Sequence, residues 1–455
     1  MRLSGSIEVN EFNDGTQLER SLGPLMLWGL GVGYVISGMY FGWNLGLPEG
    51  GVLGMAIATV FVIIMYLTFT FSYTELACSI PKAGGAFDYA QKAFGPRIGF
   101  LAGMAQNIEF IFAPPAIAFA IAAYLDTFTT GNTILPIAIG SYLIFTFINI
   151  RGVKIAASFE LIITIIAILE LLLFSGITLP HFSYEKFSLN PLPNGVSGIF
   201  AAIPFAIWFF LAIEGVANVA EETKDPQRNI SIGFGSAILT LVALCILTFI
   251  SATGVAGWEA IVYKQAGGAA LDTPLPLALS KIVGENSWLM HLLVSVGIFG
   301  LVASFHGIIL AAGRSTYEFG KVGYFPKALG TTHTKYKTPA LALIFNMLIG
   351  IIALFTGKTS EIITMACFGA LTLYMISMIS FFKLRKDFPQ LERPYKVPFY
   401  PYFPLVALVF STIALVSMTF NNTKVAFIYF SLLGGSYLVF LVMNRLQEKR
   451  SLSGA

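Results

Sequence analysis

Ionisable side chains stand inside otherwise apolar stretches of this chain, where each of them needs a compensating partner. Glu109, Glu170 and Glu214 lie in three such stretches, and His306 lies in a fourth. A carboxylate at the centre of a membrane helix costs roughly 2.5–3.5 kcal/mol on insertion scales, so it often serves a proton, an ion or a charged ligand. The three glutamates are therefore candidate coupling groups or counter-ions. A buried hydrogen bond or a helix-end position is the structural alternative for each of them.

Two apolar segments half a chain apart contain residues that can interrupt a helix. Residues 31–39 are rich in glycine and include Ser37 and Gly38, and residues 208–215 carry Glu214. An interrupted helix exposes backbone N–H and C=O groups, and a pair of such breaks at corresponding places is typical of a transporter binding site. Close helix packing is the alternative for the glycines of the first segment. The spacing predicts a site for a polar ligand between the two segments.

Trp208 stands at the start of the second segment, six residues before Glu214. An indole face can stack on a substrate or hold an ammonium group by cation–π attraction. Anchoring of a helix at the membrane interface is the alternative role for a tryptophan. Glu214 can be the counter-ion of a cationic substrate, or a gating or structural carboxylate. Both residues are thus candidates for contact with a cation.

The composition places these residues in a membrane protein. Apolar residues make up 56% of the chain and charged residues 11%, with a mean hydropathy of +0.78. So apolar a chain of 455 residues cannot fold around one soluble core. Runs of about 17–25 apolar residues predict twelve membrane helices. These runs cover residues 24–47, 51–73, 98–125, 133–150, 155–178, 198–221, 230–255, 287–318, 339–356, 360–383, 404–420 and 424–444.

Lysine and arginine are distributed unevenly between the predicted loops. With the N-terminus in the cytoplasm, most of the 27 Lys and Arg residues fall on the cytoplasmic side, where positively charged loops are retained. We therefore expect both termini to be cytoplasmic and the first span to be an uncleaved signal. The net charge of +3 reflects this topology and not nucleic-acid binding. Cys78, Cys245 and Cys367 are expected to be packing residues.

The predicted fold class is an all-α polytopic membrane protein. It has two halves, and each half contains one interrupted helix. The expected divisions are a cytoplasmic segment at residues 1–23, a first five-helix half at 24–178, a second half at 198–383, two further helices at 404–444 and a cytoplasmic tail at 445–455. The sequence has no HExxH, GxSxG, paired CxxC or phosphate-binding GxxxxGK motif. We therefore expect no metal site, no cofactor and no enzymatic reaction.

Several motifs resemble those of a known group of permeases. Residues 75–89, 92–96, 149–154 and 221–229 are similar to the amino acid–polyamine–organocation superfamily, and the resemblance extends over residues 20–445. Three further segments resemble the ethanolamine permease branch of that superfamily. They are residues 34–44, 107–115 and 302–309.

The resemblance implies a five-plus-five inverted-repeat fold with discontinuous helices 1 and 6, and transport by alternating access. It also implies a pocket between spans 1, 3, 6, 8 and 10. By matching positions, the substrate contacts would come from Ser37, Gly38, Pro114, Trp208 and Leu211, with Ile36 and Met39 beside them, Glu214 at an acidic gating position and His306 close to a span-8 aromatic contact.

Two departures from the pattern of the superfamily bear on substrate and coupling. Some proton-coupled relatives carry a lysine on span 5 near the position of Ala167, and this chain has none there. Amino acid carriers usually have two glycines around the first break for a carboxylate, whereas Ile36 replaces one of them here. The second departure fits a ligand that has no carboxylate.

These observations together predict a permease of the cell (inner or plasma) membrane for ethanolamine or a similar small organic amine. Transport would be driven by the membrane potential, by coupling to protons, or by both. An amino acid or polyamine permease is the alternative within the superfamily, and a membrane sensor of amines is the alternative from another class. The expected partners are the amine, the lipid bilayer and protons, with no nucleic acid.

Overall fold

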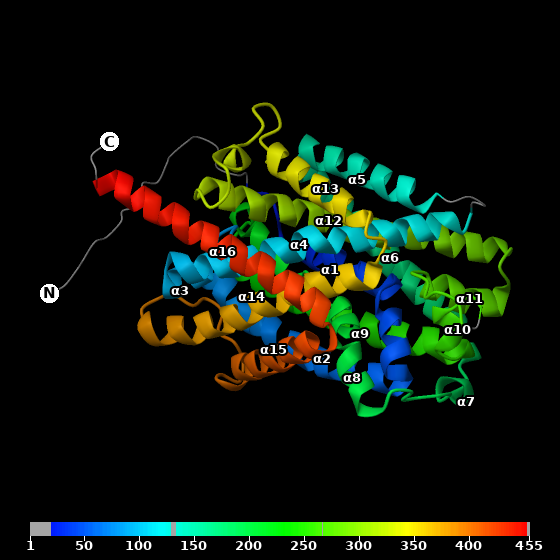
Figure 1. Ribbon diagram of the computed structural model, residues 1–455. Helices are drawn as coiled ribbons and strands as arrows, with labels where there is room; N and C mark the ends of the chain where they lie inside the picture. The colour runs from blue at the N-terminus through cyan, green and yellow to red at the C-terminus, as the bar shows by residue number, and fades with distance from the viewer. Residues whose placement is uncertain (1–19, 129–132, 266, 453–455) are drawn as a thin grey trace.

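The computed structural model describes residues 20–128, 133–265 and 267–452, with the side chains of 153–157 and 447–452 left out. Most of the predicted segment 1–23 and the last residues of the predicted tail 445–455 therefore lie outside the described residues. The described chain is almost entirely helical, and its bridges are isolated pairs, Leu22 with Thr223 and Tyr263 with Ala270. Figure 1 shows one bundle of helices.

The helices follow the predicted hydrophobic runs. Their bounds are α1 Pro24–Tyr40, η1 Trp43–Gly46, α2 Leu47–Ser79, α3 Ala86–Phe94, α4 Pro96–Asp126, α5 Ile134–Arg151, α6 Val153–Thr178, η2 Leu179–His181, α7 Tyr184–Phe187, α8 Gly195–Trp208, η3 Ile213–Glu222, α9 Pro226–Ala256, α10 Glu259–Val262, α11 Pro274–Val283, α12 Trp288–Lys321, η4 Lys327–Gly330, α13 Ala340–Leu354, α14 Thr359–Asp387, α15 Tyr402–Asn421 and α16 Thr423–Leu452.

Ten helical segments of the described chain are long and apolar enough to cross a membrane, and α1 and α13 are shorter apolar helices. Each of the twelve predicted runs falls on one of these segments. Large apolar side chains on the outer helices face outward, as lipid requires, among them Phe420 on α15 and Phe427 on α16. The predicted all-α polytopic fold is confirmed.

The innermost segments include α1, α4, α12, α14 and the segment from α8 to η3, all of which are mostly buried by their neighbours. Helix α4 packs against both α12 and α14, and α1 packs against α9 and α12. Figure 1 shows α16 running obliquely along the outside of the bundle, with α5 and α13 side by side at one edge. The interior of the bundle is therefore formed by the helices that carry the predicted site residues.

The first helix is interrupted later than the sequence indicates. The expected break lay within residues 31–39, but α1 continues as a helix to Tyr40. Phe41 is extended, and Gly42 has φ 86°, a backbone conformation that glycine adopts without strain. The short 3-10 helix η1 follows. The interruption therefore lies at residues 41–42, one helical turn beyond Ser37 and Gly38.

The second break lies where the sequence predicts it. Helix α8 ends at Trp208, and Ala212 has φ 75° in the left-handed region before the 3-10 helix η3 begins at Ile213. A residue with a Cβ pays a steric cost in that conformation, so surrounding contacts must hold it. Glu214 is the second residue of η3 and is fully buried.

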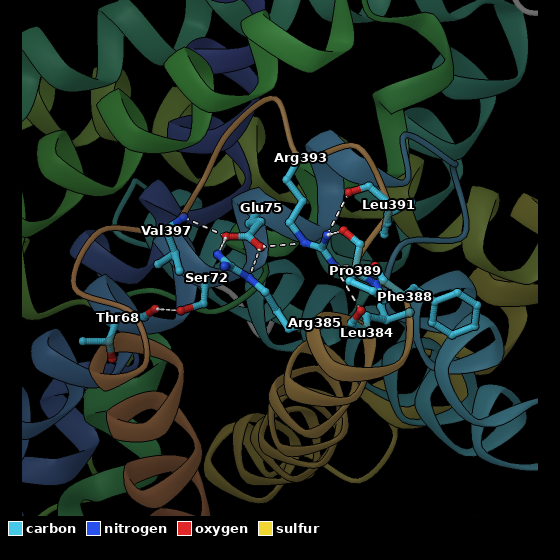
Figure 2. A network of polar contacts seen from close by, with 10 residues as sticks. All are labelled: Thr68, Ser72, Glu75, Leu384, Arg385, Phe388, Pro389, Leu391, Arg393 and Val397. Atoms are coloured by element: carbon cyan, nitrogen blue, oxygen red, sulfur yellow. Dashed lines mark hydrogen bonds and ion pairs between the residues drawn. The ribbon is translucent and has the colours of Figure 1, made fainter.

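One end of the bundle, which we call the α3 end, carries the short amphipathic helix α3. At this end, Glu75 at the end of α2 binds Arg385 at the end of α14 through two hydrogen bonds of 2.7 and 2.6 Å. Glu75 also accepts the Val397 N–H at 2.8 Å and lies 3.4 Å from Arg393. Figure 2 shows both guanidinium groups converging on this one carboxylate.

Arg393 fixes the loop that follows α14 by donating to four backbone carbonyls. The acceptors belong to Leu384, Phe388, Pro389 and Leu391. Figure 2 shows them around the arginine. The network therefore ties α2, α14 and the loop leading to α15 into one unit at the α3 end.

Candidate functional site

The two breaks are in direct contact. Gly38, near the end of α1, lies so close to the Trp208 carbonyl oxygen and to Phe209 Cα that a Cβ at Gly38 would collide with both. A Cβ at Gly42 would likewise meet the Trp208 indole. The rings of Phe41 and Trp208 meet edge to face with centroids 5.3 Å apart. The glycines of the first segment thus allow its backbone to lie against the second break.

We expect replacement of Gly38 by Ala to destabilise the protein by about 1–3 kcal/mol, the usual cost of overpacking a filled interior. The reason is that the added methyl group meets backbone atoms of Trp208 and Phe209, which cannot move as a flexible side chain would. The unfolding midpoint in detergent measures the change. Gly140→Ala on α5 is the matched control, because no atom lies within 4 Å of its added Cβ. Equal midpoints for the two variants would contradict the close contact.

A serine from α12 enters the hydrogen-bond ladder of α1. The Ser37 N–H donates to Ser304 Oγ at 2.8 Å, and Ser304 Oγ donates to the Gly33 carbonyl at 2.7 Å. In a regular helix the Ser37 N–H would bond to the Gly33 carbonyl directly. Insertion of a side chain at such a place opens a helix without breaking it. This bridge explains why α1 stays helical through Ser37 and Gly38 and is interrupted only after Tyr40.

Two buried carboxyl groups meet beside the second break. Glu109 on α4 and Glu214 on η3 are both fully buried and lie close enough to interact directly. Tyr374 on α14 donates to Glu214 Oε2 at 2.9 Å, and its hydroxyl lies 3.1 Å from that of Tyr66 on α2. Both Glu109 oxygens and Glu214 Oε1 have no well-formed hydrogen bond within the described residues. The cluster therefore carries acceptor capacity that the protein itself does not use.

The remaining predicted contact residues lie on the elements that form the breaks or carry Glu109. Ile36 and Met39 are fully buried on α1, Pro114 lies inside α4, and Leu211 lies in the link between α8 and η3. Proline cannot donate to the helical ladder, so Pro114 frees a carbonyl one turn earlier on α4. The Trp208 indole N–H is buried without a hydrogen-bond partner among the described residues. The structure thus brings spans 1, 3 and 6 together at the breaks.

Glu170, by contrast, is engaged by Tyr40, the last residue of α1. Its Oε2 accepts a hydrogen bond of 2.7 Å from Tyr40, whose own carbonyl accepts one of 2.8 Å from Tyr124. These three residues line a cavity of about 10 Å³ together with Leu275 from α11. A cavity of that size holds about one water molecule. Glu170 is therefore a hydrogen-bonded carboxyl group away from the Glu109 and Glu214 cluster.

His306 also lies away from that cluster. Its Nδ1 is 3.5 Å from Glu160 Oε2 on α6, and both side chains are 1% exposed. The rings of Phe145 and Phe159 face the imidazole. Two residues earlier on α12, Ser304 faces α1 instead. Thus α12 presents a serine to the first break and a histidine to α6.

A buried ion pair links α12 to η3 on the side of the breaks that faces the α3 end. Arg314 on α12 and Glu222 on η3 lie 2.5 Å apart, with side chains 7% and 5% exposed. Nearby, the Asn218 amide donates to the Ala83 carbonyl at 2.8 Å, and Gln106 donates to Ser315 at 3.2 Å. Spans 3, 6 and 8 are therefore linked on this side of the acidic cluster.

Several of these residues escape sequence reasoning because their partners come from distant spans. Nothing in the sequence marks out Tyr374, Tyr66 or Ser304. Glu160 gives a weak signal, because it is an acidic residue near the start of an apolar run. Arg314 gives a stronger signal, since it is a charged residue inside the predicted run 287–318.

All three cysteines are buried and unpaired, as predicted. No cluster of three metal-ligating side chains occurs in the part of the chain that the structure describes.

Comparison with known proteins places this geometry in a family. The sequence profile of the amino acid permease family matches residues 22–440. An uncharacterised transporter of Rhizobium meliloti is 28% identical over 413 residues, which cover 88% of this chain and 87% of the relative. A branched-chain amino acid permease of Bacillus subtilis is 25% identical, with 95% and 94% covered. A low-affinity putrescine importer of Escherichia coli is 27% identical, with 76% of each chain covered.

These matches extend over all the helices that form the two breaks and the acidic cluster. The relatives are transporters, and the apolar helices of this chain are those of a multi-pass membrane protein. The chain belongs to the amino acid permease family, within the amino acid–polyamine–organocation superfamily, and is a membrane transporter and not an enzyme.

Proposed function

We propose that this transporter carries ethanolamine or a similar small organic amine by alternating access. The observation that supports the proposal is the meeting of Glu109 and Glu214 beside the second break, where three carboxyl oxygens have no well-formed hydrogen bond among the described residues. Two adjacent carboxyl groups in an apolar interior cannot both be ionised unless a cation or a shared proton compensates them. An ammonium group provides that compensation and offers three donors. The buried Trp208 indole is a suitable neighbour for such a cation.

The first break favours a ligand without a carboxylate. The Ser37 N–H, which would be the natural donor to a carboxylate at this place, already donates to Ser304 Oγ. Ile36 occupies a position where a glycine would leave room, and its side chain is fully buried. A hydroxyl group can donate to the remaining lone pair of Ser304 Oγ, whereas a carboxylate would need donors that are already engaged. Ethanolamine carries such a hydroxyl at one end and an ammonium at the other.

The orientation that we propose puts the α3 end and both termini in the cytoplasm, with the protein in the inner or plasma membrane. The two halves, residues 24–178 and 198–383, would move against each other around the breaks. Movement of one positive charge through 100 mV is worth about 2.3 kcal/mol. A singly charged amine could therefore be accumulated by the membrane potential, with or without proton coupling.

An amino acid or a diamine remains the alternative substrate, because a branched-chain amino acid permease and a putrescine importer are among the relatives. Two neighbouring carboxyl groups suit a diamine better than a zwitterion, which brings a negative charge of its own. An amine sensor is the alternative from another class, and it would bind an amine without moving it.

The test is uptake of labelled ethanolamine into proteoliposomes under an inside-negative potential, with unlabelled ethanolamine, alanine, arginine and putrescine as competitors. Saturable uptake that only ethanolamine blocks is the expected result. Uptake of a labelled amino acid or putrescine in its place would overturn the substrate and keep the transporter. Binding of ethanolamine without any uptake would indicate a sensor.

A further inference from the structure

Glu160 and His306 form a second ionisable pair, separate from the acidic cluster. Glu160 lies in the first half of α6 and His306 in the middle of α12, with 3.5 Å between the carboxylate Oε2 and the imidazole Nδ1. Both side chains are 1% exposed. Neither the carboxylate oxygens nor the imidazole nitrogens have any other hydrogen-bond partner among the described residues. Within the described part of the chain, an acid and a base are thus held together in the interior with no other hydrogen-bond partner.

The surroundings of this pair are apolar, so its free energy depends strongly on how many protons it carries. The rings of Phe145 on α5 and Phe159 on α6 lie with their centroids 6.1 and 5.7 Å from that of His306. With one proton the pair carries no net charge, with two it carries +1, and with none it carries −1. A net charge is costly in such an interior. Gain or loss of a proton therefore changes which arrangement of α6 and α12 is preferred.

Few other charged groups act on the pair. Helix α1 contributes Tyr34, whose ring lies with Glu160 Oε1 against Gly307 of α12. Helix α5 contributes the Asn149 amide, which donates to the His306 carbonyl at 3.3 Å. Among the described residues, neither Glu160 nor His306 forms an ion pair with any other charged side chain.

One residue of α1 connects this pair to the opened hydrogen-bond ladder of α1. Gly33 lies directly against Glu160 Oε1 and Thr164 Oγ1, so that a Cβ on Gly33 would collide with the carboxylate. The carbonyl of the same Gly33 accepts the hydrogen bond from Ser304, which also holds the Ser37 N–H. Ser304 and His306 are two residues apart on α12. A shift of α12 relative to α6 therefore acts on α1 at the place where its ladder is open.

We propose that Glu160 and His306 form a proton-binding site that couples proton movement to transport. The site takes up a proton in one orientation of the transporter and releases it in the other, with no covalent step. In this proposal the amine binds at Glu109 and Glu214 and the proton binds at Glu160 and His306, so the substrate and the proton do not compete for one carboxyl group. The proton site stands independently of the substrate, whereas the coupling rests on the proposed transport function.

The proton site can be tested without a substrate. Infrared difference spectra of the lipid-reconstituted protein, recorded between acidic and alkaline pH, are expected to show a titrating carboxyl band that Glu160→Gln removes. His306→Gln is expected to move the titration midpoint of that band, because it removes the partner. Glu170→Gln is the matched control on the same helix and keeps the band. A band unchanged in Glu160→Gln, or a midpoint unmoved in His306→Gln, would overturn the site.

Coupling is tested in proteoliposomes with ethanolamine or, where the native protein does not carry it, with whichever of alanine, leucine and putrescine it does carry. A pH step of one unit drives about tenfold accumulation per coupled proton. We expect Glu160→Gln to lose this accumulation and to retain exchange of labelled for unlabelled substrate. Accumulation that persists in the variant, or is absent from the native protein, would overturn the coupling. Transport of none of the probes would refute the proposed function, and the infrared titration would still decide the proton site.

Discussion

Replacement of Glu214 by Gln is expected to reduce ethanolamine uptake by about 100-fold or more. The variant keeps the size of the side chain and the acceptor for Tyr374 but removes the charge that would face the ammonium group. Loss of one partner from a buried charge pair costs about 3–5 kcal/mol, and about 3 kcal/mol corresponds to more than a 100-fold change in binding. Initial uptake rates over a range of ethanolamine concentrations measure the effect.

The same experiment distinguishes a counter-ion from a structural acid. Glu109→Gln is expected to show a comparable loss, because both carboxyl groups belong to one cluster. Glu170→Gln is the matched control, since its carboxyl group is engaged by Tyr40 outside the cluster. Unchanged uptake by both the Glu214 and the Glu109 variants would remove the counter-ion model. An equal loss in the Glu170 control would show that the effect is one of folding.

Replacement of Glu75 by Gln is expected to lower the free energy of unfolding by about 3 kcal/mol. Glu75 is 2% exposed and holds the guanidinium groups of Arg385 and Arg393. Removal of the carboxylate leaves two neighbouring cations without their shared partner, and such losses cost about 3–5 kcal/mol. The lower end applies here because the Arg385 side chain, 22% exposed, can reach water. Denaturant unfolding in detergent, followed by circular dichroism, measures the loss.

The control for this prediction is an ion pair of the same type at an exposed place. Lys358 and Glu361 lie 2.9 Å apart with side chains 55% and 34% exposed. Lys358→Gln is expected to leave the free energy of unfolding nearly unchanged, as is usual for exposed pairs. A loss for Glu75→Gln no greater than for this control would show that the network in Figure 2 contributes little to stability.

The helices of this protein could be predicted from sequence because membrane spans need only length and apolar composition. The second break could also be predicted, since Glu214 interrupts an apolar run and the structure ends α8 six residues before it. Each of these features is determined by residues that are close together in the chain.

The first break shows why local patterns fall short. Glycines at 31, 33 and 38 indicate a broken helix, but the Ser304 hydroxyl from α12 bridges the opened ladder and keeps α1 helical to Tyr40. The glycines instead accommodate the Glu160 carboxylate and the Trp208 backbone. Contacts of this kind join residues more than one hundred positions apart, and hydropathy carries no information about them.

Among the site residues, too, the sequence identifies single candidates but not their partners. Glu109 and Glu214 stand out in the sequence because both are acids in apolar runs, yet nothing in the sequence shows that they meet. His306 stands out for the same reason, but its partner Glu160 lies near the beginning of a span, where an acid is ordinarily a helix-end residue. Which of these residues contact substrate stays a prediction until the variants are measured.

The burial of all three native cysteines has a practical value for determining sidedness. Because Cys78, Cys245 and Cys367 are shielded, a membrane-impermeant maleimide applied to intact cells should leave the native protein unlabelled. A single cysteine introduced at the exposed Glu185 or at the exposed Lys335 would then be the reporter. In the proposed orientation the first is labelled from outside and the second only after the membrane is opened. Because the native cysteines are buried, an introduced cysteine can report the sidedness of a loop without background labelling.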